Sequence, residues 1–185
     1  GGLDAWRKAG NRLDAKPTIR KATTFKANVK ASRYGETAEV LQIASGSLKN
    51  VQLLDSRTSA EFAGKDMRAI RGGHVPNAAL NVSHLDTLAQ AKDAKTGKMT
   101  PTAFFDADVV EKKFASLDKN KRTIGYCQTG TRSTMTYLQL RLLGFKNPAN
   151  WDESWRVYGS SLKYPAANEQ WYNLGSVNKA LAKVK

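Results

Sequence analysis

Short runs of apolar and β-prone residues predict three buried strands, at 51–55, 78–82 and 123–126. The first run ends at Asp55, and the third leads directly to Cys127. Two glycines and a proline, at 72, 73 and 76, predict a loop around His74, between the first and the second of these runs.

Apolar residues at helical spacing predict helices around these strands. They indicate a short helix over 34–47, a helical turn at 59–62 and a helix over 106–117. Strands that alternate with helices predict an α/β domain with a central, mostly parallel sheet flanked by helices. Sites in such sheets form at the carboxyl ends of the strands, where Asp55 and Cys127 are both placed.

A further helix is predicted directly after the cysteine, starting near Ser133. Its apolar residues fall at helical spacing, and Gly144 suits its C-terminal cap. These apolar residues are Met135, Leu138, Leu142 and Leu143.

The eight residues at 126–133 read Tyr-Cys-Gln-Thr-Gly-Thr-Arg-Ser and contain the only cysteine of the chain. A thiol between a strand and a helix faces the positive end of the helix dipole and unpaired backbone N–H groups. That setting favours the thiolate, which is the nucleophilic form. The alternative is a small buried apolar residue at a strand end, as free cysteines often are. A glycine and an arginine in the same loop favour the reactive thiol.

Composition narrows the remaining function classes. The chain has 185 residues, of which 41% are hydrophobic, enough for one packed domain with additional segments. No apolar run approaches membrane-spanning length, so we expect no membrane partner. One cysteine and two histidines make a zinc site unexpected, and we predict no metal and no cofactor.

A formal net charge of +14 invites a nucleic-acid interpretation, but the charge is unevenly placed. Residues 1–33 hold a surplus of seven positive charges, whereas residues 34–162 hold a surplus of only four. A solvated basic linker explains this distribution better than a nucleic-acid surface, and an acidic partner surface stays open. We therefore expect no nucleic-acid partner.

The N-terminal residues carry a pattern that returns near the end of the presumed core. Trp6-Arg7-Lys8-Ala9-Gly10 and Trp155-Arg156-Val157-Tyr158-Gly159 share Trp-Arg-x-x-Gly. The repeat suggests two homologous domains, the first mostly missing. We assign 1–15 to the end of a preceding domain, 16–33 to a basic linker, 34–165 to the main domain and 166–185 to a C-terminal tail, expected to be a helix.

Four segments, in order, resemble the rhodanese (sulfurtransferase) family. Leu53-Leu54-Asp55-Ser56-Arg57 with Glu61-Phe62 resembles the family's "LLDVR…E[FY]" segment, and the run from Gly73 to Ala78 resembles "GHIPGA". The run from Cys127 to Arg132 resembles the active loop, and the stretch from Trp151 to Gly159 resembles "GSWxEWG". The resemblance covers about residues 34–165 and implies a three-layer rhodanese-like fold. Residues 1–15 resemble the closing segment of another such domain, so the chain looks like the C-terminal part of a tandem rhodanese.

The resemblance implies covalent catalysis by Cys127. Its thiolate would take the outer sulfur of an anionic donor such as thiosulfate, and a thiol, a protein acceptor or cyanide would then remove that sulfur. Backbone N–H groups of the loop would surround the sulfur, Gly130 would permit the loop's backbone conformation, and Arg132 would bind two donor oxygens. The substrate-binding residues expected on this basis are Gln128, Thr129, Gly130, Thr131, Arg132 and Ser133.

Loop length and composition bear on the donor. Four residues separate Cys127 from Arg132, whereas a cysteine phosphatase loop has five, so sulfur chemistry is favoured over phosphate ester hydrolysis. The loop lacks both the "CRKGVT" of thiosulfate enzymes and the "CG[SA]GVT" of mercaptopyruvate enzymes. It is closer to bacterial "CQTxxR" loops, which favours thiosulfate without settling the donor.

Other polar residues have structural interpretations beside functional ones. Asp55 and Arg57 are expected to support the base of the loop or to form an ordinary strand-end salt bridge, or both. His74 is expected to be a structural hydrogen-bonding residue, because a thiolate of low proton affinity needs no base. We expect His84 at the surface and Glu61 in a helical turn.

Two further function classes stay open beside the enzyme. One is a non-enzymatic or partner-dependent rhodanese module that carries sulfur to a protein, and the other is a basic nucleic-acid-associated protein. The chain starts Gly-Gly, from which we expect a cleaved or shortened product. The Lys-, Ala- and Asn-rich, cysteine-poor composition favours the bacterial periplasm over the cytoplasm. The expected partners follow from the resemblance alone: a small anionic sulfur donor, a thiol or protein sulfur acceptor, and a preceding rhodanese domain of the same protein.

Overall fold

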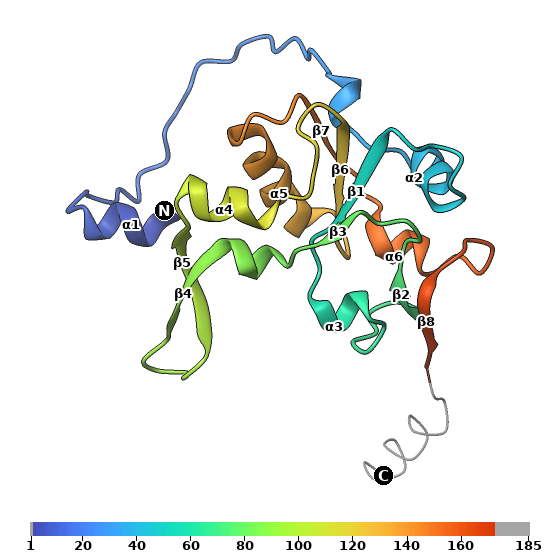
Figure 1. Ribbon diagram of the computed structural model, residues 1–185. Coiled ribbons are helices and arrows are strands. Elements are labelled where there is room, and N and C mark those ends of the chain that lie inside the picture. Colours follow the sequence, from blue (N-terminus) through green and yellow to red (C-terminus); the bar gives the residue numbers. More distant parts are fainter. Residues whose placement is uncertain (1, 173–185) are drawn as a thin grey trace, which may run out of the picture.

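The computed structural model describes residues 2–172, and its centre is a four-stranded parallel sheet (Figure 1). The strand order is β3-β1-β6-β7, with bounds Leu80–Asn81, Val51–Asp55, Arg122–Tyr126 and Asn147–Asn150. β1 pairs with β6 along its whole length, from Val51 opposite Arg122 to Asp55 opposite Tyr126. The predicted α/β fold with a parallel sheet is confirmed, although the second strand is only two residues long.

Helices cover both faces of this sheet because its central strands are apolar on both sides. Leu53 and Leu54 are both fully buried, yet they belong to different core clusters because successive side chains of a strand point to opposite faces. The helices are α2 (Thr37–Ala44) and α6 (Ser154–Tyr158) on the Leu53 side, and α4 (Ala107–Lys113) and α5 (Thr131–Leu142) on the Leu54 side.

The expected helix over 34–47 is realised as the shorter α2, and the helical turn at 59–62 as α3 (Ser59–Phe62). The helix after the cysteine begins at Thr131, slightly earlier than expected, and Gly144 follows its C-cap with φ +83°. The apolar spacing located this helix but not its buried face. Leu138 and Leu142 are exposed, whereas Thr136 and Gln139 are buried together with Leu140.

The segment around His74 is a strand and not only a loop. β2 (Arg71–His74) pairs antiparallel with β8 (Ala167–Trp171), with an irregular register between Gly72 and His74. The glycines of this segment serve close packing: a Cβ at Gly72 would lie 2.4 Å from the carbonyl oxygen of Gly64. The expected helix of the tail at 166–185 is therefore wrong for the residues of β8, and the rest of that prediction, from 173 onward, lies outside the described residues.

A two-stranded hairpin stands apart from the main sheet between η2 (His84–Thr87) and α4 (Figure 1). Its strands are β4 (Leu88–Lys92) and β5 (Met99–Phe104), and most of their residues are exposed. Asp93 closes the turn by accepting backbone N–H bonds from Lys95 and Thr96. This hairpin was not expected from the sequence, because its residues show neither a clear apolar alternation nor strong β-propensity.

The N-terminal part contains α1 (Gly2–Lys8) and then an exposed stretch, 9–30, with no helix or strand. The stretch ends at the short 3₁₀ turn η1 (Ala31–Arg33), which enters the domain beside β7. The assignments of 1–15 to a preceding domain and of 16–33 to a basic linker stay predictions.

Removing the Leu53 side chain beyond Cβ should test the two-sided core. Leu53→Ala deletes a fully buried side chain of the central strand, so we expect a loss of about 2–5 kcal/mol in the free energy of unfolding. Urea denaturation followed by circular dichroism measures the change. Leu162→Ala, at a leucine that is 67% exposed, is the matched control and should cost much less. Equal losses in both variants would contradict the assigned core.

Candidate active site

Cys127 lies at the carboxyl end of β6, as the strand pattern predicted, and it is fully buried. Three residues separate it from the start of α5 at Thr131. Its carbonyl oxygen accepts a bond from the backbone N–H of Trp155, 3.0 Å away. The first residue of the loop is therefore anchored to α6 as well as to the sheet.

Ser154 fixes the loop around the cysteine. Its Oγ accepts the backbone N–H bonds of Cys127 and Gly130, at 3.1 and 3.0 Å, and donates to the carbonyl of Trp151 at 2.7 Å. The side chain is completely buried, and the residue has φ +51°, a conformation that a non-glycine residue rarely adopts. Strained residues that the surroundings hold in place concentrate at functional sites. Sequence reasoning recognised the segment from Trp151 to Gly159 but did not single out this serine.

Gly130 turns the loop into the helix. It is the N-cap of α5 with φ +77°, and a Cβ at this position would lie 2.2 Å from Oδ1 of Asp152. Both the backbone conformation and the space require glycine. Its carbonyl accepts a bond from the Ser133 hydroxyl at 2.8 Å, so the first turn of the helix is tied to the loop.

The start of α5 offers backbone donors beside the thiol. The first-turn N–H groups of a helix have no acceptor within the helix, and no side chain caps α5. Within the described chain, the N–H groups of Thr131, Arg132 and Ser133 have no bonded acceptor. Of the donors expected to form a nest around the sulfur, the N–H of Gly130 is instead taken by Ser154.

Gln128 connects the loop to the segment after α3. Its side-chain Nε2 donates to the carbonyl of Arg68 at 2.7 Å. Its backbone carbonyl accepts from the backbone N–H of Arg156 at 2.8 Å. Thr129 and Thr131 are exposed on the outer side of the loop. The structure therefore brings the six expected loop residues together and gives Gln128 a bridging position.

Arg132 is held by Glu61. The guanidinium donates from Nη1 and Nη2 to the two carboxylate oxygens, at 2.8 and 2.7 Å. Glu61 is 1% exposed and also closes a capping box with Thr58, so it is the helical-turn residue expected and a partner of the active loop in addition. Because both terminal nitrogens are engaged, a role for Arg132 in holding two donor oxygens stays a prediction.

The electrostatics of this pair are strongly coupled. Burial by itself would raise the pKa of Glu61, but the hydrogen bonds from Arg132 and Thr58 lower it to about 2. The pKa of Arg132 is raised, first by its hydrogen bond to Glu61 and also by Cys127 nearby. A permanent positive charge therefore stands beside the cysteine.

Asp55 and Arg57 form a buried ion pair, with Nη2 of the arginine 2.6 Å from Oδ2 of the aspartate. Burial by itself would lower the pKa of Arg57, but Asp55 raises it overall. The guanidinium also donates to the carbonyl of Gly73 and lies 4.7 Å from the Trp155 ring centre. The pair is thus a strand-end salt bridge. Its arginine packs on Trp155, whose backbone N–H donates to the carbonyl of Cys127.

The two histidines differ from each other. His74 stacks on Phe62, with ring centres 3.6 Å apart, and its Nδ1 bonds the Phe62 carbonyl, in keeping with the structural role expected. His84 is not a surface residue as expected: it is half-buried, and its N–H bonds the carbonyl of Ser56. Burial, and then the charge of Arg132, lowers the pKa of His84, which places it near the active loop. The sequence held no local motif that could have shown this.

Two kinds of feature are absent from residues 2–172. No group of His, Cys, Asp and Glu within 2–172 could hold a metal ion. No helix of that part of the chain is long and apolar enough to cross a membrane.

Comparison with known families identifies the same family that the sequence motifs resemble. A model of the rhodanese-like domain matches residues 37–161, which include both β1 and the Cys127 loop. The chain belongs to the rhodanese-like family. The expected resemblance is thereby confirmed for the domain, although its place at the end of a tandem is not.

Curated rhodanese relatives are longer than this chain. A protein of Saccharopolyspora erythraea, provisionally named a thiosulfate sulfurtransferase, is 32% identical over 179 residues, which are 92% of this chain and 59% of the relative. The thiosulfate sulfurtransferase of Corynebacterium glutamicum is 32% identical over 122 residues, which are 61% of this chain and 37% of the relative. The chain thus spans less than two thirds of these relatives.

Solved structures agree on the rhodanese fold. Tum1 protein from Saccharomyces cerevisiae superposes with a TM-score of 0.69 at 21% identity, over 91% of this chain and 59% of Tum1. The anaerobic ergothioneine biosynthesis enzyme of Chlorobium limicola superposes with a TM-score of 0.71 at 16% identity, over 89% of this chain and 39% of the enzyme. At such identities the likeness concerns the fold.

Ser154→Ala should loosen the rhodanese loop without changing backbone strain, since alanine keeps the Cβ. The buried N–H groups of Cys127 and Gly130 would lose their acceptor, and we expect a cost of about 1–3 kcal/mol in unfolding free energy. Urea denaturation measures it. Ser160→Ala removes an exposed hydroxyl that bonds only the Arg156 carbonyl and is the control. A Ser154 variant as stable as the control would show that the loop does not depend on this hydroxyl.

Glu61→Gln should flatten the acid dependence of stability. The pKa of Glu61 is lowered to about 2 in the folded protein, so its carboxylate stabilises the fold above the unfolded value of about 4.5, and this contribution is lost as the pH falls toward 2. Glutamine cannot lose that contribution. Thermal melts from pH 6 to pH 2.5 should therefore show a lower melting temperature at pH 6 and a shallower slope than in the parent. Glu111→Gln, which removes an exposed carboxylate of α4, controls for the loss of one negative charge.

Proposed function

We propose that this rhodanese domain transfers a sulfane sulfur from an anionic, thiosulfate-like donor to a thiol or cyanide through a persulfide on Cys127. The single observation that carries the proposal is the position of the chain's only cysteine, directly before the unbonded N–H groups that open α5. A helix start of this kind favours an anion beside it, both as thiolate and as persulfide.

The first half-reaction forms the persulfide. The Cys127 thiolate attacks the outer sulfur of thiosulfate, a sulfur–sulfur bond forms to the cysteine, and the bond between the two donor sulfurs breaks. Sulfite leaves with the electron pair of that bond. The N–H groups of Thr131, Arg132 and Ser133 are the donors that we assign to the sulfur and the departing anion.

The second half-reaction restores the thiolate. An acceptor thiolate attacks the outer sulfur of the persulfide and leaves as a new persulfide, while the electron pair of the broken bond returns to Cys127. Cyanide would leave as thiocyanate by the same step. Because the two half-reactions share one covalent intermediate, donor and acceptor need not be present together.

Arg132 contributes a fixed charge in this proposal. Glu61 engages its two terminal nitrogens, so the guanidinium is oriented before any donor arrives. Asp55 and Arg57 do not touch the reacting atoms in this proposal. They hold the end of β1 and the Trp155 ring in place, and these in turn position the loop. None of these residues requires a cofactor.

The burial of Cys127 favours a second candidate, a sulfur carrier that depends on a protein partner. Gln128 and the Arg68 carbonyl close one side of the loop, and a partner that displaces this contact would expose the thiol. Steady turnover with thiosulfate and cyanide by the isolated chain supports the enzyme. Persulfide formation without turnover supports the carrier.

A preceding rhodanese domain is the protein partner that we propose within the same polypeptide. Trp6-Arg7 lies in α1 and Trp155-Arg156 lies in α6, so the repeated motif is helical in both copies. The curated relatives extend well beyond the length of this chain. A second domain would account for both observations.

Cys127→Ser should abolish sulfur loading and preserve the fold, because a hydroxyl has nearly the same size but cannot form a persulfide. Intact mass spectrometry after incubation with thiosulfate should show a gain of one sulfur atom in the parent and none in the variant. Addition of cyanide should return the parent to its original mass. A gain that persists in the serine variant would place the sulfur elsewhere and refute the role of Cys127.

A further inference from the structure

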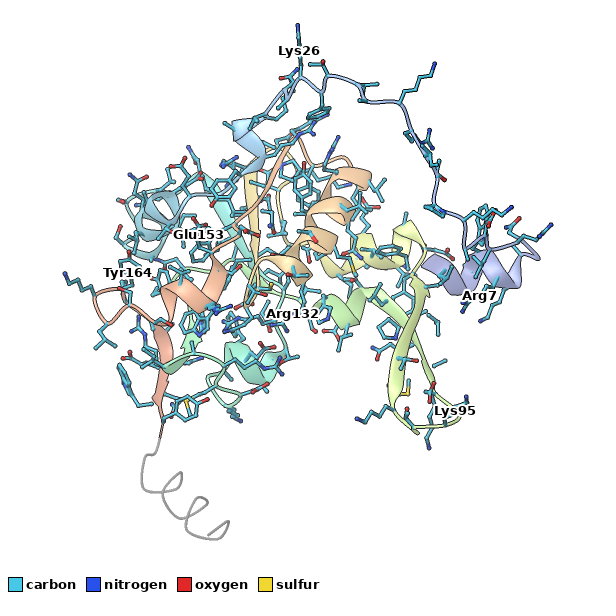
Figure 2. The ribbon with its side chains drawn as sticks, turned by 180° about the vertical axis from the view of Figure 1, so that it is seen from behind. Arg7, Lys26, Lys95, Arg132, Glu153 and Tyr164 are labelled. Atoms are coloured by element: carbon cyan, nitrogen blue, oxygen red, sulfur yellow. The ribbon has the colours of Figure 1, made fainter. Side chains whose placement is uncertain are left out.

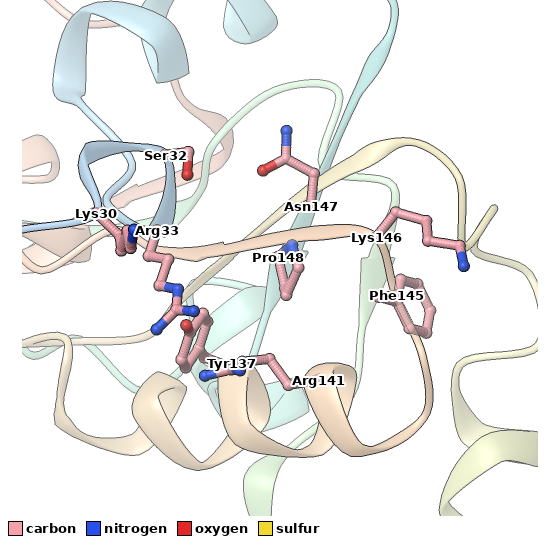
Figure 3. A pocket seen from close by; sticks show the side chains of 9 residues that line it. All are labelled: Lys30, Ser32, Arg33, Tyr137, Arg141, Phe145, Lys146, Asn147 and Pro148. Atoms are coloured by element: carbon pink, nitrogen blue, oxygen red, sulfur yellow. The ribbon is translucent and has the colours of Figure 1, made fainter.

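A basic cavity lies at the end of the domain opposite the active loop (Figure 3). It has a volume of about 380 Å³ and lies where η1 meets the end of α5 and the start of β7. Cys127 follows the carboxyl end of β6, whereas this cavity lies beside the amino end of β7, so the two sites are separate.

Four cationic residues line the cavity, and no acidic residue does. They are Lys30, Arg33, Arg141 and Lys146. Figure 3 shows the guanidinium groups of Arg33 and Arg141 on the same side as the Tyr137 ring, while Lys146 extends away on the other side. Like charges around one cavity repel each other, and an anion between them would relieve that repulsion.

The cations of this cavity differ from most arginines of the domain. Most of its arginines pair with a carboxylate: Arg57, Arg68, Arg71, Arg122 and Arg132. The four cations of the cavity have no ion-pair partner in the described part of the chain. Exposed cations elsewhere, such as Lys113 and Lys163, also have no ion pair among the described residues, but these four line one hollow.

The wall of the cavity is fixed by contacts that do not use these cations. Arg122 donates to the Ser32 and Tyr34 carbonyls and to Oδ1 of Asn147, at 2.5, 2.8 and 3.3 Å, and it pairs with Glu39. It therefore fastens η1 to the start of β7. The end of the basic linker becomes one wall, which brings Lys30 and Arg33 to the same cavity as Arg141.

The nearby end of α5 does not oppose an anion strongly. A helix C-terminus carries partial negative charge on its last carbonyls. Here the N–H groups of Leu143, Gly144 and Phe145 bond the carbonyls of Gln139, Arg141 and Leu140. Much of that negative end is therefore already satisfied, and the guanidinium of Arg141 stands over the Tyr137 ring, 5.9 Å from its centre.

We propose that this cavity binds a small oligophosphate anion, independently of sulfur transfer. Guanidinium groups bind phosphate oxygens in pairs, and the volume lies within the range of small-ligand pockets. Inorganic oligophosphate and nucleoside triphosphate share this chemistry. Tyr137, beside Arg141, offers a ring on which the base of a nucleotide could stack. Inorganic oligophosphate has no base, so the two ligands can be distinguished.

Isothermal titration calorimetry with tripolyphosphate tests the proposal on the chain as it stands. We expect saturable binding at one site per chain, weaker at higher salt because the contacts are ionic. The double variant Arg33→Gln with Arg141→Gln should bind at least tenfold more weakly. The control, Lys113→Gln with Lys163→Gln, removes two exposed cations outside the cavity and should change affinity less than twofold.

The source of the phosphate is read from a second titration, with ATP. If ATP binds more tightly than tripolyphosphate, and Tyr137→Leu removes this difference, the ligand is a nucleotide. If the two affinities are equal, the cavity recognises phosphate alone. Absence of saturable binding, or equal weakening in the control, overturns the proposal. Tighter binding of a hexaglutamate peptide or a single-stranded oligonucleotide, abolished by the double variant, also overturns it. Persulfide loading by all these variants should match the parent, so the result is separate from that for Cys127.

Discussion

The buried guanidinium of Arg57 is the contact on which the arrangement of the site depends. It pairs with Asp55 at the end of β1, donates to the carbonyl of Gly73 in β2, and packs between Tyr126 of β6 and Trp155 of α6. Asn81 of β3 bonds the carbonyls of both Asp55 and Arg57. Three strands and one helix therefore meet at a single desolvated charge, and β3 joins them through the two backbone carbonyls. An unpaired charge at such a depth is costly, so these elements stay together or separate together.

Arg132, labelled in Figure 2, belongs to a site whose contacts divide into those that sequence could reveal and those that it could not. Cys127, Gly130 and Arg132 lie within six residues, and this short segment sufficed to predict a cysteine between a strand end and a helix start; the reactivity of its thiol stays a prediction. Ser154 and Glu61 reach the loop from 24 to 71 residues away along the chain. No local pattern encodes such contacts, because they depend on which strand ends lie side by side. His84 was missed for the same reason.

The fold shows the same division. β1 and β6 are short apolar runs, which identified them as strands, and their alternation with helices predicted a mostly parallel sheet. The pairing of β1 with β6 was not predicted. The hairpin and β8 are largely exposed, and their pairing depends on a neighbouring strand more than on their own composition. Backbone pairing can override weak propensity, as it does for Arg71–His74, where Gly73 allows close approach of β2 and β8.

The exposed hairpin has a practical consequence for handling the molecule. β4 and β5 leave and re-enter the domain between η2 and α4, and they bond to each other without joining the central sheet. Their turn, at 93–97, is exposed or half-exposed and is closed mainly by the Asp93 side chain. Lengthening a surface turn of this kind adds little loop-closure entropy. The turn is consequently a natural attachment point for a fluorophore or an affinity peptide, since a graft there leaves both the sheet order and the cysteine loop unchanged.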